Sequence, residues 1–210
     1  MALLPEVQLD TDEQKVSYGF GLQFGDQLHR NNFDNLSLEA VIAGITHWYE
    51  NQQSALSDAD LNPSYQVIQD KQKAKAAELS KKRDELASQF MEANAAREEV
   101  TTTASGLQYE VLESGSGVKP DLHSTVVTHY HGTLIDGTVF DSSVDRGEPA
   151  TFGVNQVISG WTEALQLMSV GDKWRIACPP DLAYGEQGAG DSIPPNTALV
   201  FEIHLIDITD

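Results

Sequence analysis

The chain is poor in cysteine, in positive charge and in long apolar runs. Its 210 residues include one cysteine, so an intramolecular disulfide and a four-cysteine zinc site are both excluded. Only 13 residues are lysine or arginine against 32 aspartates and glutamates, which gives a formal net charge of −19. A surface this acidic repels phosphate backbones, so we expect no nucleic-acid partner. No segment approaches the roughly 20 consecutive apolar residues of a membrane-spanning helix, and we expect no membrane insertion.

The N-terminus has little that indicates export. The first residues, Met-Ala-Leu-Leu-Pro-Glu, contain neither a basic leader nor a long apolar stretch. The low cysteine content suits a reducing compartment. We therefore expect a cytoplasmic protein, with a periplasmic one as the alternative if a leader was removed. The single cysteine, Cys178, ends an apolar run without a neighbouring base, which predicts a small buried residue and not a reactive thiol.

Residues 1–61 predict a helical domain. Thr11 and Gln14 have capping-box spacing at the start of a helix predicted for residues 11–30. Apolar residues recur there at every fourth position: Val16, Phe20, Phe24 and Leu28. A second helix is predicted for residues 37–51, with its apolar positions at Leu38, Val41, Ile42, Ile45, Trp48 and Tyr49.

Three glycines, Gly19, Gly21 and Gly25, lie inside the first predicted helix. Each costs about 1 kcal/mol relative to alanine, and close approach of another helix would compensate. The alternative is that the helix breaks near residues 19–21.

So short a segment cannot bury its aromatic residues alone. We expect a second copy to cover them, giving a symmetric homodimer, whereas the competing arrangement packs these helices on the C-terminal domain of their own chain. The predicted interface residues are Val16, Phe20, Gly21, Phe24, Gly25, Leu28, Val41, Ile45 and Trp48.

Residues 62–100 predict one long connecting helix. Asn62 and Pro63 are typical of a helix start, and no proline or glycine follows before residue 100. At about 1.5 Å per residue such a helix exceeds about 50 Å. Its apolar positions are sparse and hold no heptad, which favours a solvated bridge between two packed regions over a coiled coil.

Residues 101–210 predict an α+β domain. The predicted strands are residues 106–113, 125–134, 139–141, 172–178 and 198–207, and the only predicted helix is residues 161–168. Asp136-Gly137 is a hairpin signal between two of the strands. The fold expected from the whole chain is therefore an all-helical module, a long connecting helix and an antiparallel sheet wrapped on one short helix.

Signatures of hydrolytic or phosphate chemistry are missing from the sequence. It contains no phosphate-binding loop, no nucleophile elbow and no zinc-protease helix motif. His129 and His131 share one face of a predicted strand, with His123 upstream, but a metal site needs a further ligand in defined geometry. We interpret them as surface histidines and predict no metal and no cofactor. What stands out is a set of aromatic residues: Tyr130, Phe140, Phe152, Trp161, Tyr184 and Phe201.

The aromatic residues lie in segments that resemble a known family. Residues 101–208 are similar to the FK506-binding proteins, a family of peptidyl-prolyl cis/trans isomerases. The matching segments are HYHG at 129–132, LIDGTVFDSS at 134–143, VISGW at 157–161, AYG at 183–185 and IPPNTALVF at 193–201. The rest of the chain, including SYGFG at 17–21, resembles the two-domain bacterial subgroup of FKBP22-like and macrophage-infectivity-potentiator-like proteins, which have a helical dimerisation module and a long connecting helix.

The resemblance implies an apolar proline-binding pocket. Trp161 would form its floor, and Asp141 and Tyr184 would supply polar contacts, with Arg146 orienting Asp141. The implied catalytic residues are Asp141, Tyr184, Trp161 and Phe140, and the implied substrate- and inhibitor-binding residues are Tyr130, Arg146, Phe152, Val157, Ile158, Ile193 and Phe201.

The resemblance also implies partners. Proline-containing polypeptides would be clients, and macrolides of the FK506 and rapamycin type would be inhibitors. Ala150, Ala189 and His131 depart from common residues of the family and bear on inhibitor affinity. The expected function is isomerisation of X-Pro bonds during protein folding, combined with client binding through the N-terminal domain. The alternative is a non-catalytic chaperone or binding scaffold.

Overall fold

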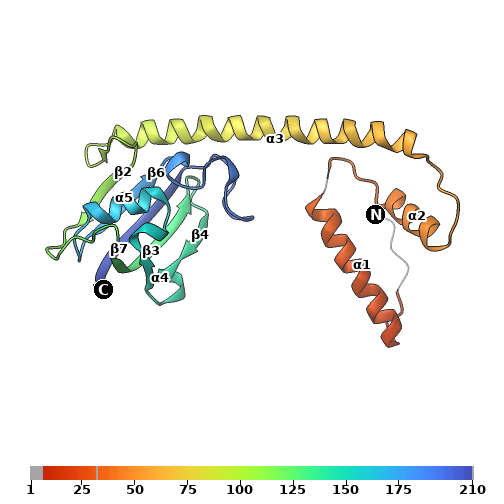
Figure 1. Ribbon diagram of the computed structural model, residues 1–210, viewed down its shortest axis with the longest axis horizontal. Coiled ribbons are helices and arrows are strands. Elements are labelled where there is room, and N and C mark those ends of the chain that lie inside the picture. Colours follow the sequence, from red (N-terminus) through yellow and green to blue (C-terminus); the bar gives the residue numbers. More distant parts are fainter. Residues whose placement is uncertain (1–6, 32, 210) are drawn as a thin grey trace. The chain divides into compact units, whose positions relative to one another are not determined.

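The structure is a computed structural model in which residues 7–31 and 33–209 are described. The chain divides into two compact units, residues 1–75 and residues 76–210 (Figure 1). The division falls inside the long helix α3, Asp58–Ala95. Among the described residues, no helix is both long enough and apolar enough to cross a bilayer.

The first unit begins with helix α1, Asp12–Arg30. Its predicted capping box is confirmed, because the Thr11 hydroxyl accepts the Gln14 N–H at 3.3 Å and the Gln14 side chain accepts the Thr11 N–H at 3.1 Å. The helix runs unbroken through its three glycines, so the alternative of a break near residues 19–21 is wrong. Helix α2, Leu38–Tyr49, follows with Ser37 as its N-cap, close to its predicted bounds.

Helix α3 begins four residues before the predicted start. The Ser57 backbone N–H and hydroxyl both donate to Asp60 Oδ2, at 3.0 and 2.6 Å, which caps the helix there. Asn62 is therefore not the cap, and Pro63 lies inside the helix. A proline has no N–H to donate to the carbonyl four residues earlier, so the helix lacks one backbone hydrogen bond here. This loss is tolerated close to the helix start, where the preceding turn is already capped.

The last turns of α3 pack on the sheet of the second unit. Ala87 is buried, Asn94 Nδ2 donates to Gln108 Oε1 at 2.8 Å, and Gln108 Nε2 donates to the Met91 carbonyl at 2.9 Å. From Ala76 onward the helix thus belongs to the folded second unit (Figure 1). A solvated bridge between two packed regions was expected because the apolar residues of this helix are sparse and hold no heptad, but its last turns are part of the packed second unit.

The second unit is built on an antiparallel sheet of short and long strands. Its strands are β1 Thr101–Thr102, β2 Gln108–Glu113, β3 Thr125–Leu134, β4 Val139–Ser142, β5 Ala150–Gly153, β6 Lys173–Cys178 and β7 Leu199–Thr209. Their order is β1-β2-β6-β7-β3-β4, and β5 also pairs with β3. Helix α5, Ser159–Leu167, matches the predicted short helix within two residues.

Several short elements of this unit were not predicted. These are strands β1 and β5, the single-turn helix α4, Ser143–Arg146, and the 3-10 turns η1 Val154–Gln156, η2 Pro180–Leu182 and η3 Gly185–Gln187. The expectation of only one helix in this domain is therefore wrong. Elements of two to four residues are too short to show a hydrophobic period, and tertiary contacts decide whether they form.

The core lies between α5 and one face of the sheet, which we call the inner face. Cys178 on β6 is buried there as predicted, and burial raises the pKa of its thiol. A Cβ at Gly160 would lie 2.5 Å from Cys178 Sγ, so this glycine lets α5 approach β6 closely. That close approach places the next residue, Trp161, against the inner face.

Candidate active site

The inner face carries a pocket of about 390 Å³ at the N-terminal end of α5. Strands β3, β4, β5 and β7, the 3-10 turn η1 and the start of α5 contribute to it. Its lining residues are Tyr130, Phe140, Asp141, Phe152, Gln156, Val157, Ile158, Trp161, Tyr184 and Phe201. Nine of these ten were implied site residues, and the structure brings them together.

The floor of the pocket is a set of rings packed edge to face on Trp161. Its indole lies 5.4 Å from the Tyr130 ring, 5.8 Å from Phe152 and 5.4 Å from Phe201, with interplanar angles of 82–84°. Trp161 is 4% exposed, and its indole N–H has no partner among the described atoms. Edge-to-face packing fixes the ring orientations and keeps the floor apolar.

Gly132 on β3 is needed for the wall of the pocket. A Cβ at this position would lie 2.7 Å from the Phe140 ring and 3.0 Å from the Phe201 ring. Those two rings pack edge to face at 5.5 Å. The glycine of the HYHG segment therefore makes room for two aromatic wall residues.

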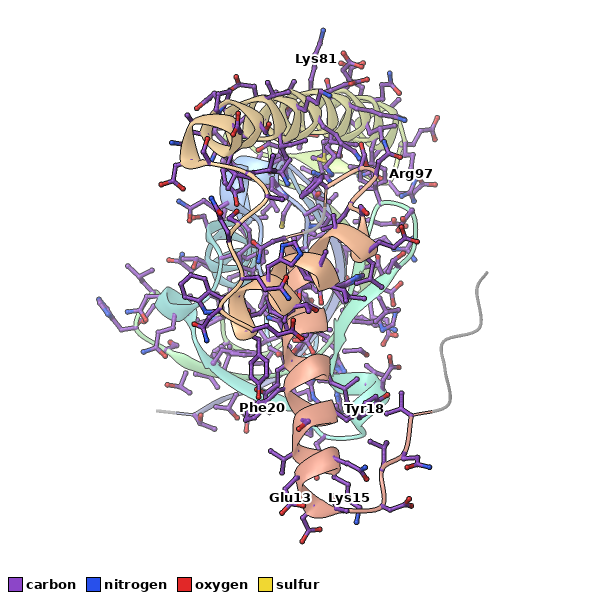
Figure 2. All side chains as sticks on the ribbon, turned by 90° about the vertical axis from the view of Figure 1, so that its right-hand side faces the viewer. Glu13, Lys15, Tyr18, Phe20, Lys81 and Arg97 are labelled. Carbon is purple, nitrogen blue, oxygen red and sulfur yellow. The ribbon has the colours of Figure 1, made fainter. Side chains whose placement is uncertain are left out.

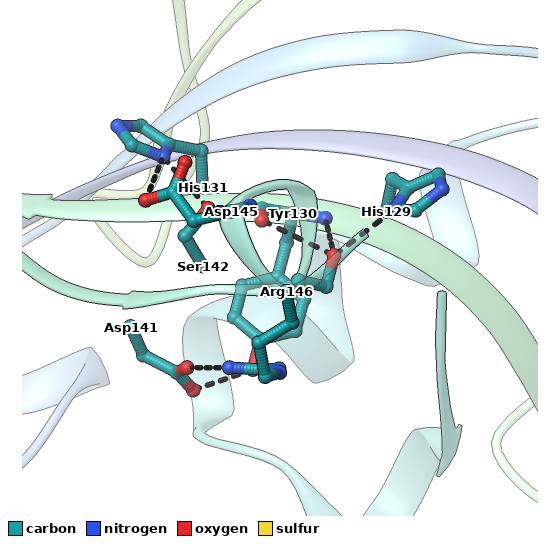
Figure 3. Close-up of polar contacts among 8 residues, drawn as sticks. His129, Tyr130, His131, Asp141, Ser142, Asp145 and Arg146 are labelled. Carbon is teal, nitrogen blue, oxygen red and sulfur yellow. Dashed lines mark hydrogen bonds and ion pairs between the residues drawn. The ribbon is translucent and has the colours of Figure 1, made fainter. Parts of the chain in front are cut away.

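Three polar groups meet at the rim (Figure 3). The Tyr130 hydroxyl donates to Asp141 Oδ2, and Arg146 Nη1 donates to Asp141 Oδ1. Arg146 Nη2 also donates to the Tyr130 hydroxyl, at 2.9 Å. Asp141 is thus held from two sides, by a buried phenol and by a guanidinium at the end of α4.

These contacts set the ionisation of the rim. Burial acts to raise the pKa of Asp141, but hydrogen bonds from Tyr130 and Arg146 outweigh it, and the pKa lies below its usual value. Burial and the bond to Asp141 raise the pKa of Tyr130. Hydrogen bonds to Tyr130 and Asp141 likewise raise the pKa of Arg146. At neutral pH the rim therefore holds a carboxylate, a neutral phenol and a guanidinium.

Two implied site residues lie outside the lining, and one lining residue was missed. Arg146 does not line the pocket, but it contacts Asp141 and Tyr130 at the rim. Ile193, which was also expected to contact substrate, is buried in the core, its backbone pairs with Ala189, and it does not line the pocket. Gln156 was missed because a lone exposed glutamine in a short 3-10 turn carries no sequence signal.

The opposite face of the sheet, which we call the outer face, carries ion pairs where the inner face carries aromatic rings. A cavity of about 340 Å³ lies there beneath α3, lined among others by Phe90, Arg97 and Arg175. Arg97 pairs with Glu110 and Arg175 pairs with Glu202, each at 2.7 Å. Because these charges are already paired, the cavity presents few groups for chemistry. Within residues 7–31 and 33–209, no cluster of three or more potential metal ligands is found.

Comparison with known proteins identifies the family. Residues 117–206 match the FKBP-type peptidyl-prolyl cis-trans isomerases. The FKBP-type 22 kDa peptidyl-prolyl cis-trans isomerase of Escherichia coli strain K12 is 46% identical over 199 residues, covering 95% of this chain and 97% of that protein. This chain belongs to the FKBP-type peptidyl-prolyl cis-trans isomerases.

The similarity extends beyond the catalytic domain of this isomerase. Residues 13–111 match the domain that lies amino-terminal to FKBP-type isomerases. The outer membrane protein MIP of Legionella longbeachae is 40% identical, covering 99% of this chain and 91% of that protein. The crystal structure of FkpA from Escherichia coli matches with a TM-score of 0.70 and 34% identity, covering 96% of this chain and 99% of that one.

The comparisons bear out three of the predictions for the isomerase. The two-part FKBP fold, the membership of the bacterial subgroup and the peptidyl-prolyl isomerase activity are confirmed. A cytoplasmic location is not supported, because one of the similar proteins is named an outer membrane protein.

Proposed function

We propose that the pocket floored by Trp161 is where this isomerase binds and twists the X-Pro bond. The observation that carries the proposal is an apolar, ring-lined pocket with one ionised carboxylate at its rim. Rotation about an X-Pro bond faces a barrier of about 20 kcal/mol because the amide is conjugated, and no bond needs to be broken. The site must therefore stabilise the twisted amide more than the planar one.

The chemistry of the twisted amide matches this lining. Twisting removes amide resonance, so the carbonyl becomes less polar and the nitrogen more pyramidal. An apolar site that excludes water disfavours the planar ground state relative to the twisted state. Each tenfold of acceleration needs about 1.4 kcal/mol, which a few contacts can supply.

We assign roles by position in the pocket. Trp161, Phe140 and Phe201 hold the proline ring. The half-exposed Tyr184 hydroxyl anchors a substrate carbonyl, and the Asp141 carboxylate faces the twisted amide. Macrolides of the FK506 and rapamycin type would occupy the same pocket. Arg146 keeps Asp141 ionised and oriented.

The role of Asp141 predicts a flat pH profile. Because its pKa is lowered, its carboxylate stays ionised above the usual value of about 4, and activity falls only as the pH drops through the lowered pKa. The raised pKa of Tyr130 keeps its phenol neutral up to about pH 10. We expect kcat/KM on a short X-Pro peptide to vary less than about twofold between about pH 5 and about pH 9. Asp141→Asn should lower it about tenfold throughout.

Glu202→Gln is the matched control, because Glu202 is also an ion-paired acid but lies on the outer face with Arg175. It should leave kcat/KM unchanged. Wild-type activity of the Asp141→Asn variant, or a titration midpoint near neutral pH in the wild type, would contradict the assignment.

We further infer that a homodimer forms through the first unit. Helices α1 and α2 expose large apolar side chains, with Phe20 66% and Trp48 88% exposed. Figure 2 shows Tyr18 and Phe20 projecting from α1. Among the described atoms, nothing lies within 4 Å of the position of a Cβ on Gly19, Gly21 or Gly25, so the α1 backbone is open to close approach.

A second copy is the partner that this surface fits best. The proposed interface residues are those of the sequence-based prediction: Val16, Phe20, Gly21, Phe24, Gly25, Leu28, Val41, Ile45 and Trp48. Burying them would contribute about 25 cal/mol for each Å² of apolar surface removed from water. The dimer would present two pockets to one proline-containing client, which supports client holding as well as isomerisation.

The domain boundaries and the compartment remain part of the proposal. The proposed working parts are a helical domain at residues 1–61, a connecting helix at 62–100, which corresponds to the observed helix Asp58–Ala95, and an isomerase domain at 101–210, to which the helix from Ala76 onward is attached. The name of the Legionella longbeachae protein favours a location in the cell envelope, in line with the periplasmic alternative.

A further inference from the structure

Strand β3 has a gap on one edge, next to the pocket. Strand β5 pairs with β3 from Thr125 to Thr128, and β4 pairs with it from His131 to Thr133. Between these two partners, Tyr130 faces no strand on this edge of the described sheet. A buried backbone N–H and C=O left without a partner are costly, so something else must satisfy them.

The hydroxyl of Ser143 fills this gap. It accepts the Tyr130 backbone N–H at 2.8 Å and donates toward the Tyr130 carbonyl at 3.3 Å. Ser143 is 0% exposed, and its hydroxyl also lies 3.2 Å from His129 Nδ1. A hydroxyl can donate one hydrogen bond and accept two. The Ser143 side chain therefore makes both backbone hydrogen bonds that a neighbouring strand would otherwise make to Tyr130.

Helix α4 makes a second contact with Tyr130, through the side chain of its last residue. Helix α4 begins at Ser143 and ends at Arg146, whose guanidinium binds the Tyr130 hydroxyl and Asp141. Ser143 thus holds the backbone of Tyr130 while Arg146 holds its side chain.

A second contact ties the start of α4 to β3. The Ser142 hydroxyl caps α4 by accepting the Asp145 N–H at 3.1 Å, and it lies 2.9 Å from His131 Nδ1. Asp145 Oδ2 is 4.0 Å from the same imidazole nitrogen. Both histidines of β3 therefore contact the first residues of the turn, and the position of α4 depends on the Ser142 and Ser143 hydroxyls.

We propose that Ser143 is a positioning residue of the isomerase: its hydroxyl fixes α4 to the Tyr130 backbone and so holds Arg146 and Asp141 together at the rim of the pocket. The inference rests on the proposed roles of Asp141 and Arg146. Ser143 touches no substrate and acts only through these neighbours. Its removal should disturb the transition state more than substrate binding, because the rim groups face the reacting amide.

The test is a double-mutant cycle on the full chain, with Ser143→Ala, Arg146→Ala and the combined variant assayed on a short X-Pro peptide. We expect Ser143→Ala to lower kcat about five- to tenfold with KM within about twofold. If Ser143 acts through Arg146, the combined variant should be no slower than Arg146→Ala alone. Ser124→Ala is the control, since Ser124 is also buried and precedes β3, and its hydroxyl bonds only to Asp121 among the described residues; this variant should keep wild-type kcat.

The outcomes separate this inference from the proposed site. Unchanged kcat in Ser143→Ala, or losses that multiply in the combined variant, would overturn the positioning role while the site stands. Unchanged activity of Arg146→Ala would overturn the proposed rim and the inference with it. Amide hydrogen exchange of the wild type tests the inference without a variant. The Tyr130 amide should exchange as slowly as the β3 amides that are hydrogen-bonded to neighbouring strands. Exchange as fast as that of a surface loop would overturn the inference.

Discussion

Replacing Trp161 with alanine is expected to abolish most of the isomerase activity and to lower the free energy of unfolding of the second unit by about 3–5 kcal/mol. The stability loss follows from removing a buried indole that three other rings pack against. The activity loss follows from removing the floor on which the proline ring would lie. Peptide isomerisation and denaturant unfolding, measured on the same preparation, check both parts.

A matched variant separates the two effects. Trp174 is also a buried tryptophan, stacked on Tyr109 at a centroid distance of 4.3 Å, but it does not line the pocket. Trp174→Ala should destabilise the second unit to a similar extent and keep its activity at temperatures where it is folded. Equal loss of activity in both variants would mean that Trp161 acts only through stability.

Removing the first unit is expected to spare catalysis on peptides and to slow catalysis on proteins. A chain that starts at Ala76 should keep kcat/KM on a short X-Pro peptide within about threefold, because the pocket lies wholly in the second unit. On a protein whose refolding is limited by proline isomerisation it should be at least about tenfold less effective, since two linked sites raise the effective concentration of client. A start at Thr101 is less suitable, because it would remove the α3 contacts to Gln108.

Point variants of the full chain test the same idea without deletion. Phe20→Asp should halve the mass measured in solution and reproduce the loss on protein substrates. Tyr65→Asp is the control, because Tyr65 is similarly exposed on α3 but outside the proposed interface, and it should leave the mass unchanged. A truncated chain or a Phe20→Asp variant with full activity on proteins would contradict client holding by a dimer.

Local signals in the sequence predicted elements that short-range interactions decide. The capping box of Thr11 and Gln14 and the hairpin at Asp136-Gly137 both form, and Gly137 takes the positive φ of 88° that its turn requires. The start of α3 was misplaced because two local signals competed, and the cap made by Ser57 and Asp60 prevailed over Asn62-Pro63.

The candidate site was predictable in composition but not in geometry. The sequence motifs were enough to predict which aromatic residues line the pocket. The position of α4, in contrast, depends on the hydrogen bond between Ser143 and a strand residue thirteen positions away, which no local sequence pattern indicates. The missed lining residue Gln156 lies in the 3-10 turn η1, and the buried Ile193 pairs with Ala189, so both positions depend on tertiary structure.

The most direct test of the pocket is an NMR titration of the isotope-labelled full chain with a short X-Pro peptide, recording amide shifts and cis/trans exchange of the peptide together. The account predicts accelerated exchange, with the largest shifts at Val157, Ile158, Tyr184 and the Trp161 indole N–H. Shifts centred on the outer-face cavity near Phe90, Arg97 and Arg175 would contradict it.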